Sequence, residues 1–522
     1  MTVQPHDIVV VIPVADRPRH LADCLHSLLE LGRRYPYGGS VSVLVAEDSH
    51  DEESMARHRT LAAEVTEQGI PVHYLSPDEQ RALVEALPPG ERSLLAGVIG
   101  DGGSYAHKGA SITRNIAYLW LRRLQNDGQR RLFWFLDSDQ EFRVNVEEEG
   151  SEREVYAVDY CNGLDRIFRE TPTQILTGKV VGDPPVSPAV MAGNFLDDVA
   201  AFLTDMGRRE PQAECSFHDA VRPADDAAYH DMAELFGFQQ AEAFRYRCTL
   251  SGAHDHARCF ADFAAKLARF FDGEHPTRRS VYEPAELMVT VKPARTIYTG
   301  NYVFTPDGLD YFIPFAALRL RMAGPTLGRI IKAELGERFV SANLPMLHRR
   351  TVEAIGQSEF RPGIERTQQR IDLSGEFERQ YFGDVMLFSM ERLTSAGYPA
   401  AGLGEHEIDA VVTEVDGEMF ARYAAKHRET VAKIDRLQAA FEAPTQWWHQ
   451  PPDLEEARVL VRQFVDNMRY NFGDDSSAWQ RLSDEAHRRS RMQSITEAIA
   501  GYGEVRAVWH TVLEQQGEAM AS

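Results

Sequence analysis

Short apolar runs alternate with amphipathic helical patterns along the N-terminal part of the chain. Three of these runs have the length of strands: Ile8–Pro13, Val41–Ala46 and Val72–Leu75. Between them, apolar residues recur at helical spacing over Leu21–Leu29, and Glu52–Gly69 has the pattern of a more polar helix. Strands that alternate with helices in this way predict a βαβαβ opening with a parallel sheet.

A fourth apolar run, Leu132–Leu136, is followed at once by Asp137 and Asp139. Five apolar residues in a row are typical of a strand that is buried on both faces. Ligands of open α/β sheets lie outside the carboxyl ends of the strands, so we expect both carboxylates near a substrate. Two carboxylates favour a hard divalent cation whose other ligands are phosphate oxygens. The alternative is an ordinary polar turn at the end of a strand.

A glycine-rich segment, Gly97–His107, leads into an amphipathic helix that begins near Ala110. Lys108, Arg114 and Asn115 therefore lie near a helix N-terminus, a position that suits a pyrophosphate. The segment matches neither the Walker loop nor the Gly-x-Gly-x-x-Gly pattern. The alternative is a glycine-rich turn with solvated cations.

The middle of the chain continues the alternation. We expect a charged loop at Glu147–Glu154, a helix at Tyr160–Arg169 and a strand at Ile175–Val181. Strand character resumes at Thr296–Phe304, with Gly300 inside the run. The expected fold class is therefore α/β, with a mixed, mostly parallel sheet.

Two helical regions complete the expected organisation. Residues 189–280 have the pattern of a helical insertion into an α/β domain that spans residues 1–350. Residues 351–522 form a helical C-terminal region. That region could bind an acceptor, cover the site as a lid or form a homodimer, and the sequence leaves these three roles open.

Composition bears mainly on partners and compartment. The net charge of −23 argues against a nucleic-acid-binding surface. No apolar run reaches the length of a membrane-spanning helix, and the N-terminus lacks the pattern of a secretory signal. Five cysteines, an odd number, fit a reducing compartment better than a disulfide framework. We expect a cytoplasmic protein.

Four of these pieces occur in a recognisable order: the strand that ends at Ile12-Pro13, Glu47-Asp48-Ser49, the helix start at Lys108–Asn115, and Asp137-Ser138-Asp139. Together they resemble the nucleotide-sugar-binding half of GT-A fold glycosyltransferases, in particular the family 2-like group. The resemblance covers roughly residues 7–350. It implies a Rossmann-like domain whose Asp-x-Asp motif holds Mn²⁺ or Mg²⁺ against the donor diphosphate.

The resemblance implies a role for each matching residue. Three further stretches resemble family motifs: the Gly-Asn strand beside the donor sugar at Thr299–Phe304, the Phe-x-x-x-Arg-x-Arg stretch at Phe315–Arg321, and a strand ending in a metal-binding histidine at Asn343–His348. The implied site residues are Pro13, Ala15 and Arg17 near the nucleotide, Asp48 or Glu47 at the base or ribose, Lys108, Arg114 and Asn115 by the phosphates, Ser138, Gly300 and Asn301 by the donor, and Asp137, Asp139 and His348 at the metal.

The chain departs from the family at Met322–Thr326, where many inverting relatives carry an acidic pair. A base must lie within hydrogen-bond reach of the acceptor proton. Asp310, Asp219 and Asp384 are candidates by residue type alone. A retaining mechanism, in which the leaving phosphate takes the proton and Asp139 acts through the metal, is slightly favoured.

The predicted function is a hexosyltransferase-type glycosyltransferase that uses a UDP- or GDP-sugar and a small-molecule, glycan or peptide acceptor. One alternative is a sugar nucleotidyltransferase, which is disfavoured because the loop Val14–Pro18 lacks glycines. The other alternative is a non-catalytic module that binds a nucleotide sugar.

The insertion carries ligands of the kind that a structural zinc ion takes in three stretches: Cys215-x-x-His218, Cys248 and His254-x-His256-x-x-Cys259. The expected ligand set is Cys215, His218, Cys248 and Cys259. The spacing is not that of a standard zinc finger. The alternative is a set of buried free cysteines beside surface histidines.

Overall fold

The computed structural model describes residues 4–124, 129–148, 151–183, 187–218, 246–349, 364–366 and 370–518. Asp219, one of the candidate bases, lies outside the described residues.

A single large sheet forms the centre of the molecule, and the described residues contribute nine strands to it. Six of the strands run in one direction, while β5, β9 and β10 are antiparallel to their neighbours. The expected fold class, a mixed and mostly parallel α/β sheet, is confirmed. The strand order is β3 (Val72–Leu75), β2 (Val41–Glu47), β1 (Asp7–Val14), β4 (Arg131–Leu136), β10 (Asn301–Phe304), β8 (Ile175–Gly182), β11 (Phe339–His348) and β5 (Gln140–Glu141), with β9 (Lys292–Pro293) also on β11.

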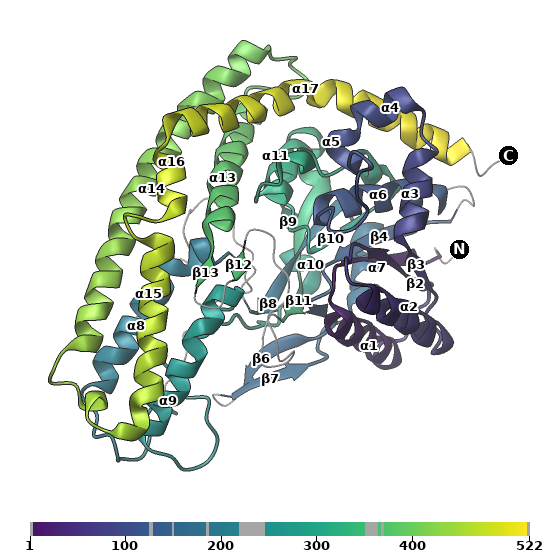
Figure 1. The fold of residues 1–522 in the computed structure, drawn as a ribbon. Helices are drawn as coiled ribbons and strands as arrows, with labels where there is room; N and C mark the ends of the chain where they lie inside the picture. The colour runs from purple at the N-terminus through teal and green to yellow at the C-terminus, as the bar shows by residue number, and fades with distance from the viewer. Residues whose placement is uncertain are drawn as a thin grey trace.

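Helices cover both faces of the sheet (Figure 1). Successive residues of a strand point to opposite faces, and β1 shows this directly. Val9 and Val11 enter one apolar cluster with helix α6, whereas Ile8 and Val10 enter another with helix α1. The predicted βαβαβ opening is confirmed. The covering helices are α1 (Pro18–Arg34), α2 (Glu52–Glu67), α6 (Ala110–Arg122), α7 (Tyr160–Glu170) and α11 (Ala323–Leu335).

The expected loop at Glu147–Glu154 was wrong. The segment belongs to a hairpin of β6 (Val144–Glu148) and β7 (Ser151–Val155), which pair antiparallel beside the main sheet. The charged residues at the end of β6 interrupt the apolar alternation by which a strand is recognised in a sequence. Opposite charges also lie across the pair, because Arg153 Nη1 is 2.8 Å from a Glu148 carboxylate oxygen.

Three short helices between β3 and α6 were not predicted, because each is too brief to show a period. They are α3 (Pro77–Glu85), α4 (Pro89–Leu94) and α5 (Ala96–Ile99).

The insertion and the C-terminal region share one apolar core. Phe260 of α9 stacks on Trp448, with ring centroids 5.2 Å apart, and Phe195 of α8 packs edge-on against Phe464 of α15. In Figure 1 the long helix α17 crosses from the C-terminal helices to the helices above the sheet. The helices are α8 (Pro188–Met206) and α9 (His256–Lys266) in the insertion, and α13 (Ser374–Ser395), α14 (Glu405–Glu442), α15 (Glu455–Phe472), α16 (Ser477–Ser483) and α17 (Glu485–Glu518) after it.

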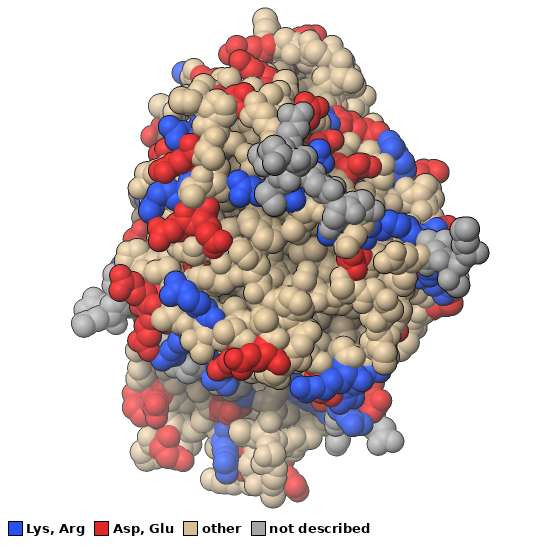
Figure 2. Space-filling view, turned by 90° about the vertical axis from the view of Figure 1, so that its right-hand side faces the viewer, with Lys and Arg blue, Asp and Glu red and all other residues tan. Residues whose placement is uncertain are grey.

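Among the described residues, no helix combines the length and the apolar character needed to cross a membrane. Figure 2 shows acidic and basic side chains interspersed around one face, with uncharged residues between them.

Candidate functional site

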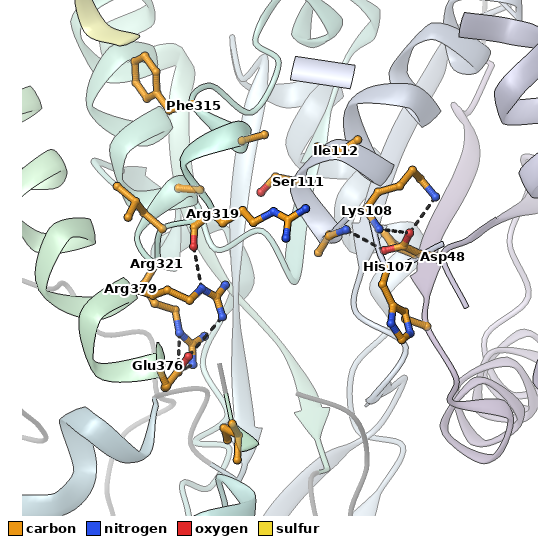
Figure 3. A pocket seen from close by; sticks show the side chains of 18 of the residues that line it. Asp48, His107, Lys108, Ser111, Ile112, Phe315, Arg319, Arg321, Glu376 and Arg379 are labelled. Carbon is orange, nitrogen blue, oxygen red and sulfur yellow. Dashed lines mark hydrogen bonds and ion pairs between the residues drawn. The ribbon is translucent and has the colours of Figure 1, made fainter. Parts of the chain in front are cut away.

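A cavity of about 700 Å³ lies at the carboxyl ends of β1, β2 and β4, between the sheet and helix α13. Figure 3 shows its two walls: side chains of the sheet and α6 on one side, and an arginine-rich group on the other. Ligands of open α/β sheets bind at this edge. Six of the predicted site residues line the cavity: Pro13, Ala15, Arg17, Asp48, Lys108 and Ser138.

Asp48 and Lys108 form a buried pair that fixes the loop before α6. Lys108 Nζ donates to Asp48 Oδ1 at 2.8 Å and to the Tyr105 carbonyl at 2.8 Å. The Asp48 carboxylate also accepts from the backbone N–H groups of Lys108 and Gly109. Burial lowers the pKa of Lys108, and the charge of Asp48 opposes that change. The ammonium group is thus engaged with protein acceptors and holds the loop in place.

A second polar pair links two loops at the mouth of the cavity. His107 Nε2 lies 2.5 Å from Asp16 Oδ2. The other Asp16 oxygen accepts from the backbone N–H groups of His50 and Asp51, and the Asp16 N–H donates to Ser49 Oγ at 2.7 Å. The loops that follow β1 and β2 are therefore tied to each other and to the loop that precedes α6.

The end of β4 brings Asp139 next to Arg17 and His348. Arg17 Nη1 donates to Asp139 Oδ2 at 3.1 Å. The other oxygen, Oδ1, lies 3.7 Å from His348 Nε2, and both residues are buried. Antiparallel pairing of β5 with β11 places Gln140 opposite His348 and so sets this approach.

A backbone carbonyl fixes the orientation of the His348 ring. Its Nδ1 lies 2.9 Å from the Asp183 carbonyl oxygen. A carbonyl can only accept, so Nδ1 carries the proton, and in the neutral ring Nε2 presents its lone pair toward Asp139. A nitrogen lone pair and a carboxylate oxygen that face each other are a favourable pair of ligands for a divalent cation.

Asp137, the first acid of the motif, points elsewhere. Its Oδ1 forms an ion pair with the buried Arg114, and its backbone N–H donates to the Gly300 carbonyl at 3.2 Å. A Cβ on Gly300 would lie 2.5 Å from Asp137 Oδ2, so this strand start accepts only glycine without displacement. Asp137, Asp139 and His348 do not form a cluster with all ligand atoms within 4.8 Å of one another in the described chain.

The opposite wall carries three arginines. Arg319 reaches toward Ser111 of α6 (Figure 3). Arg321 Nε donates to Glu376 Oε1 at 2.7 Å, and Arg379 Nη1 lies 3.4 Å from the other Glu376 oxygen. Burial lowers the pKa of Arg379, and the charge of Arg321 lowers it further. This wall favours anionic groups.

Backbone strain is concentrated around the same cavity. The described chain contains five non-glycine residues with positive φ, between 50° and 67°. Conformations of this kind cost side-chain-bearing residues energy and cluster at functional sites. Three of the five line the cavity and the other two are bonded or adjacent to lining residues; they are Asp16, His107, Phe315, Arg319 and Met322.

Three of the predicted donor-site residues instead tie elements together. The Glu47 carboxylate is fully buried and accepts from His58 and Tyr74. Burial alone would raise the pKa of Glu47, but the hydrogen bond and charge of His58 lower it. Asn115 bonds the backbone of Ile313 in both directions, and Asn301 accepts from the Trp134 indole N–H at 2.9 Å. None of these three residues lines the cavity.

The two remaining candidate bases lie away from the cavity. Asp310 is 3.3 Å from His510 of α17. Asp384 is fully buried in α13, where it accepts from Gln380 at 3.0 Å and from Tyr423 at 2.5 Å. Burial raises the pKa of Asp384 to about 7. Neither carboxylate is placed to take a proton from a molecule in the cavity.

Three of the four predicted zinc ligands lie together, and a different histidine is the fourth. In the described chain, the Cys215, Cys248 and Cys259 thiols and a ring nitrogen of His254 all lie within 4.8 Å of one another. His254 therefore takes the place that we expected for His218, which lies beside it with the ring centroids 4.9 Å apart. A hydrogen bond from Cys259 lowers the pKa of Cys248 to about 5.

Several residues of the cavity carry no local signal in the sequence. Arg319 and Arg321 belong to the stretch Phe315–Arg321, which resembles a family motif, but Glu376 and Arg379 lie on α13, beyond the predicted α/β domain. Only the packing of α13 against α11 brings them to the sheet.

No family model matches the chain, and no curated protein is similar to it. Among solved structures, the chain is similar to core-mannan synthase A (CmsA/Ktr4) from Aspergillus fumigatus in its Mn/GDP form, with 12% identity and a TM-score of 0.21 over 68% of this chain and 70% of that chain. A TM-score this low does not establish a common fold.

Proposed function

We propose that this protein is a metal-dependent glycosyltransferase of the GT-A type, which transfers a sugar from a nucleoside-diphosphate sugar to an acceptor. The observation that carries the proposal is the approach of Asp139 Oδ1 and His348 Nε2, 3.7 Å apart and both buried, at the strand ends beside the cavity. A carboxylate and an oriented imidazole would hold Mn²⁺ or Mg²⁺, and the nitrogen ligand favours Mn²⁺.

The metal ligands supplied by the chain are Asp139 and His348. When bound, the metal would neutralise the negative charge that develops on the leaving nucleoside diphosphate. Arg17 donates to Asp139, so it would hold this carboxylate in place for the metal. Asp137 is held by Arg114 and would act by positioning the turn.

The donor would lie along the sheet wall. Pro13 and Ala15 form an apolar shelf next to Asp48, which suits a nucleoside at the ends of β1 and β2. Arg319 faces this wall and carries no ion pair that binds it elsewhere in the described chain. We propose that Arg319, and not Lys108, supplies the second cation for the diphosphate.

The acidic side chains that line the described cavity are Asp48, Glu365 and Glu376. Asp48 bonds Lys108, and Glu376 is clamped by Arg321 and Arg379. Carboxylates engaged by cations are weak proton acceptors. Two of the three cavity carboxylates are therefore poor bases, and the third, Glu365, is exposed. This arrangement supports a retaining reaction, in which the leaving phosphate oxygen takes the acceptor's proton while the acceptor hydroxyl oxygen attacks the anomeric carbon.

The acceptor would enter from the α13 side. Glu376 and Arg379 place the C-terminal region in the cavity wall, which supports an acceptor-binding role for this region. We also propose a cytoplasmic location, because none of the five cysteines forms a disulfide, as expected in a reducing compartment.

The test is product analysis with a panel of UDP- and GDP-sugars, with and without Mn²⁺. A transferase or donor hydrolase releases nucleoside diphosphate. A nucleotidyltransferase run in reverse with pyrophosphate releases nucleoside triphosphate, and a binding module releases neither product. Metal-dependent release of UDP or GDP is the expected result, and the absence of release from every donor would contradict the proposal.

A further inference from the structure

We infer that Cys215, Cys248, His254 and Cys259 bind one structural zinc ion. Their four ligand atoms all lie within 4.8 Å of one another. Among the described residues, no other three or more His, Cys, Asp or Glu side chains bring their ligand atoms this close together. The three cysteines are buried, with 0–6% of their surface exposed. The site does not depend on the proposed function, because none of its members lines the cavity.

The donor set and its dimensions fit zinc. Three thiolates and one imidazole form one of the standard tetrahedral sets of structural sites. With Zn–S bonds of about 2.3 Å, tetrahedral thiolates lie about 3.8 Å from one another. The four atoms are already gathered within the limits of such a set. Four protein ligands leave no open position, so the ion would be structural.

His254 is oriented as a ligand. Its Nδ1 lies 2.8 Å from the Gly252 carbonyl oxygen, which can only accept, so Nδ1 carries the proton. Nε2 then turns its lone pair to the thiols and lies 3.3 Å from Cys248 Sγ. A backbone carbonyl behind the ring is the usual partner that fixes a zinc-bound histidine.

The backbone holds the ligands in place from three segments. The Cys215 N–H donates to the His254 carbonyl at 2.9 Å, and the Cys248 N–H donates to the Phe217 carbonyl at 3.0 Å. Cys259 lies in the first turns of α9, and its N–H donates to the Asp255 carbonyl. The cluster therefore joins the chain that follows α8 to the start of α9.

Neighbouring histidines have other roles. His256 Nδ1 lies 2.9 Å from the Glu210 carbonyl, and its Nε2 lies 3.2 Å from the Ser216 N–H, so its ring bridges two loops. His218 stands edge-on to the His254 ring but is not one of the four gathered ligands. His218→Ala is therefore a matched control for His254→Ala.

The position of the cluster indicates what the ion would do. Phe217, two residues after Cys215, packs edge-on against Tyr246, and Phe202 of α8 stacks on Phe263 of α9 with ring centroids 3.8 Å apart. The three thiols belong to the same apolar core as α14 and α15. Zinc would fasten the end of the insertion onto this core.

The experiment measures zinc in the full-length protein purified under reducing conditions without added chelator. We expect about one zinc per chain in the wild type and in His218→Ala. His254→Ala and Cys248→Ser should each lose most of it and should unfold at lower temperature. Cys24→Ser, which alters a free buried thiol outside the cluster, should keep the zinc.

Cobalt replacement keeps the inference testable if the ligand variants fail to fold. Wild-type protein refolded with Co²⁺ should show the visible absorption of a tetrahedral site together with thiolate-to-metal charge-transfer bands. Wild-type protein without stoichiometric zinc, a cobalt spectrum without thiolate bands, or a folded Cys248→Ser variant that retains full zinc would each overturn the inference.

Discussion

Asp139 Oδ1 and His348 Nε2 face each other at 3.7 Å, although the two residues lie at the ends of strands far apart in the sequence. The approach is set by the β5–β11 pairing, by the Asp183 carbonyl behind the imidazole and by Arg17 on the other carboxylate oxygen. Each contact restrains one of the two proposed metal ligands. Preorganisation of this kind reduces the ordering that metal binding would otherwise require.

Removing the side chain of Arg319 should weaken nucleotide binding without destabilising the fold. Arg319 has a φ of +51°, which glycine adopts without strain, so Arg319→Gly should have unchanged or higher thermal stability. The Kd for UDP or GDP should rise about 10-fold or more, since a charge-assisted hydrogen bond is lost. Calorimetric titration checks the affinity. The exposed Arg338 is the control, and equal effects of Arg319→Gly and Arg338→Gly on the Kd would refute the assignment.

Lys108→Met should act mainly on stability. The change leaves the buried Asp48 carboxylate without its cation, at a cost of about 3–5 kcal/mol in the free energy of unfolding. Urea denaturation measures this cost, and Lys332→Met on the exposed side of α11 is the control. If Lys108 were a phosphate ligand and nothing more, the unfolding free energy would stay near the wild-type value while only the nucleotide Kd rose.

Elements with a local sequence pattern were predicted correctly, whereas contacts between residues far apart in the sequence were not. The short apolar runs located β1, β2, β3 and β4, and with them the edge at which the cavity lies. The pairing of Lys108 with Asp48 joins residues 60 positions apart, so no local pattern separates an internal ion pair from a phosphate ligand. An internal ion pair and a phosphate ligand both require a cation near the start of a helix.

The same limit explains the other site differences. Glu376 and Arg379 reach the cavity because α13 packs against α11, a contact between regions that the sequence separates. His218 and His254 are both close to a cysteine in sequence, and only the backbone bonds of Gly252 and Cys215 select His254.

Gly300→Ala should disturb the turn after β4. The new Cβ would lie 2.5 Å from Asp137 Oδ2 and 2.8 Å from Gln140 Nε2. We expect a loss of about 1–3 kcal/mol in unfolding free energy and slower donor turnover, because overpacking displaces the acidic motif. Gly503→Ala in helix α17 meets no atom within 4 Å and should be neutral or stabilising. Wild-type stability and turnover in Gly300→Ala would show that the turn tolerates the methyl group.

Asp384 should make stability depend on pH. Its folded pKa of about 7 lies above the usual value for an unfolded Asp of about 3.9, so the folded state keeps a proton that the unfolded state releases. The stability that this proton provides is complete below pH ~4 and is lost as the pH rises to about 7.

Asp384→Asn removes this dependence. The wild type should therefore lose unfolding free energy relative to the variant between these pH values, by an amount on the order of 4 kcal/mol. Denaturant titrations at pH 5 and pH 8 measure the part of this loss that falls in that interval, about 2–3 kcal/mol. The exposed Asp435 provides the control variant, and parallel pH profiles of wild type and Asp384→Asn would contradict the burial argument.

We propose that Asp139 and His348 bind the metal that holds the donor diphosphate. Calorimetry of UDP and GDP binding, with and without Mn²⁺, tests it most directly in the wild type, Asp139→Asn, His348→Gln and the control Asp310→Asn. We expect Mn²⁺ to tighten binding of the cognate nucleotide to the wild type and to Asp310→Asn, and we expect this gain to fall about 100-fold or more in the other two variants. An unchanged gain from Mn²⁺ in both Asp139→Asn and His348→Gln would contradict it.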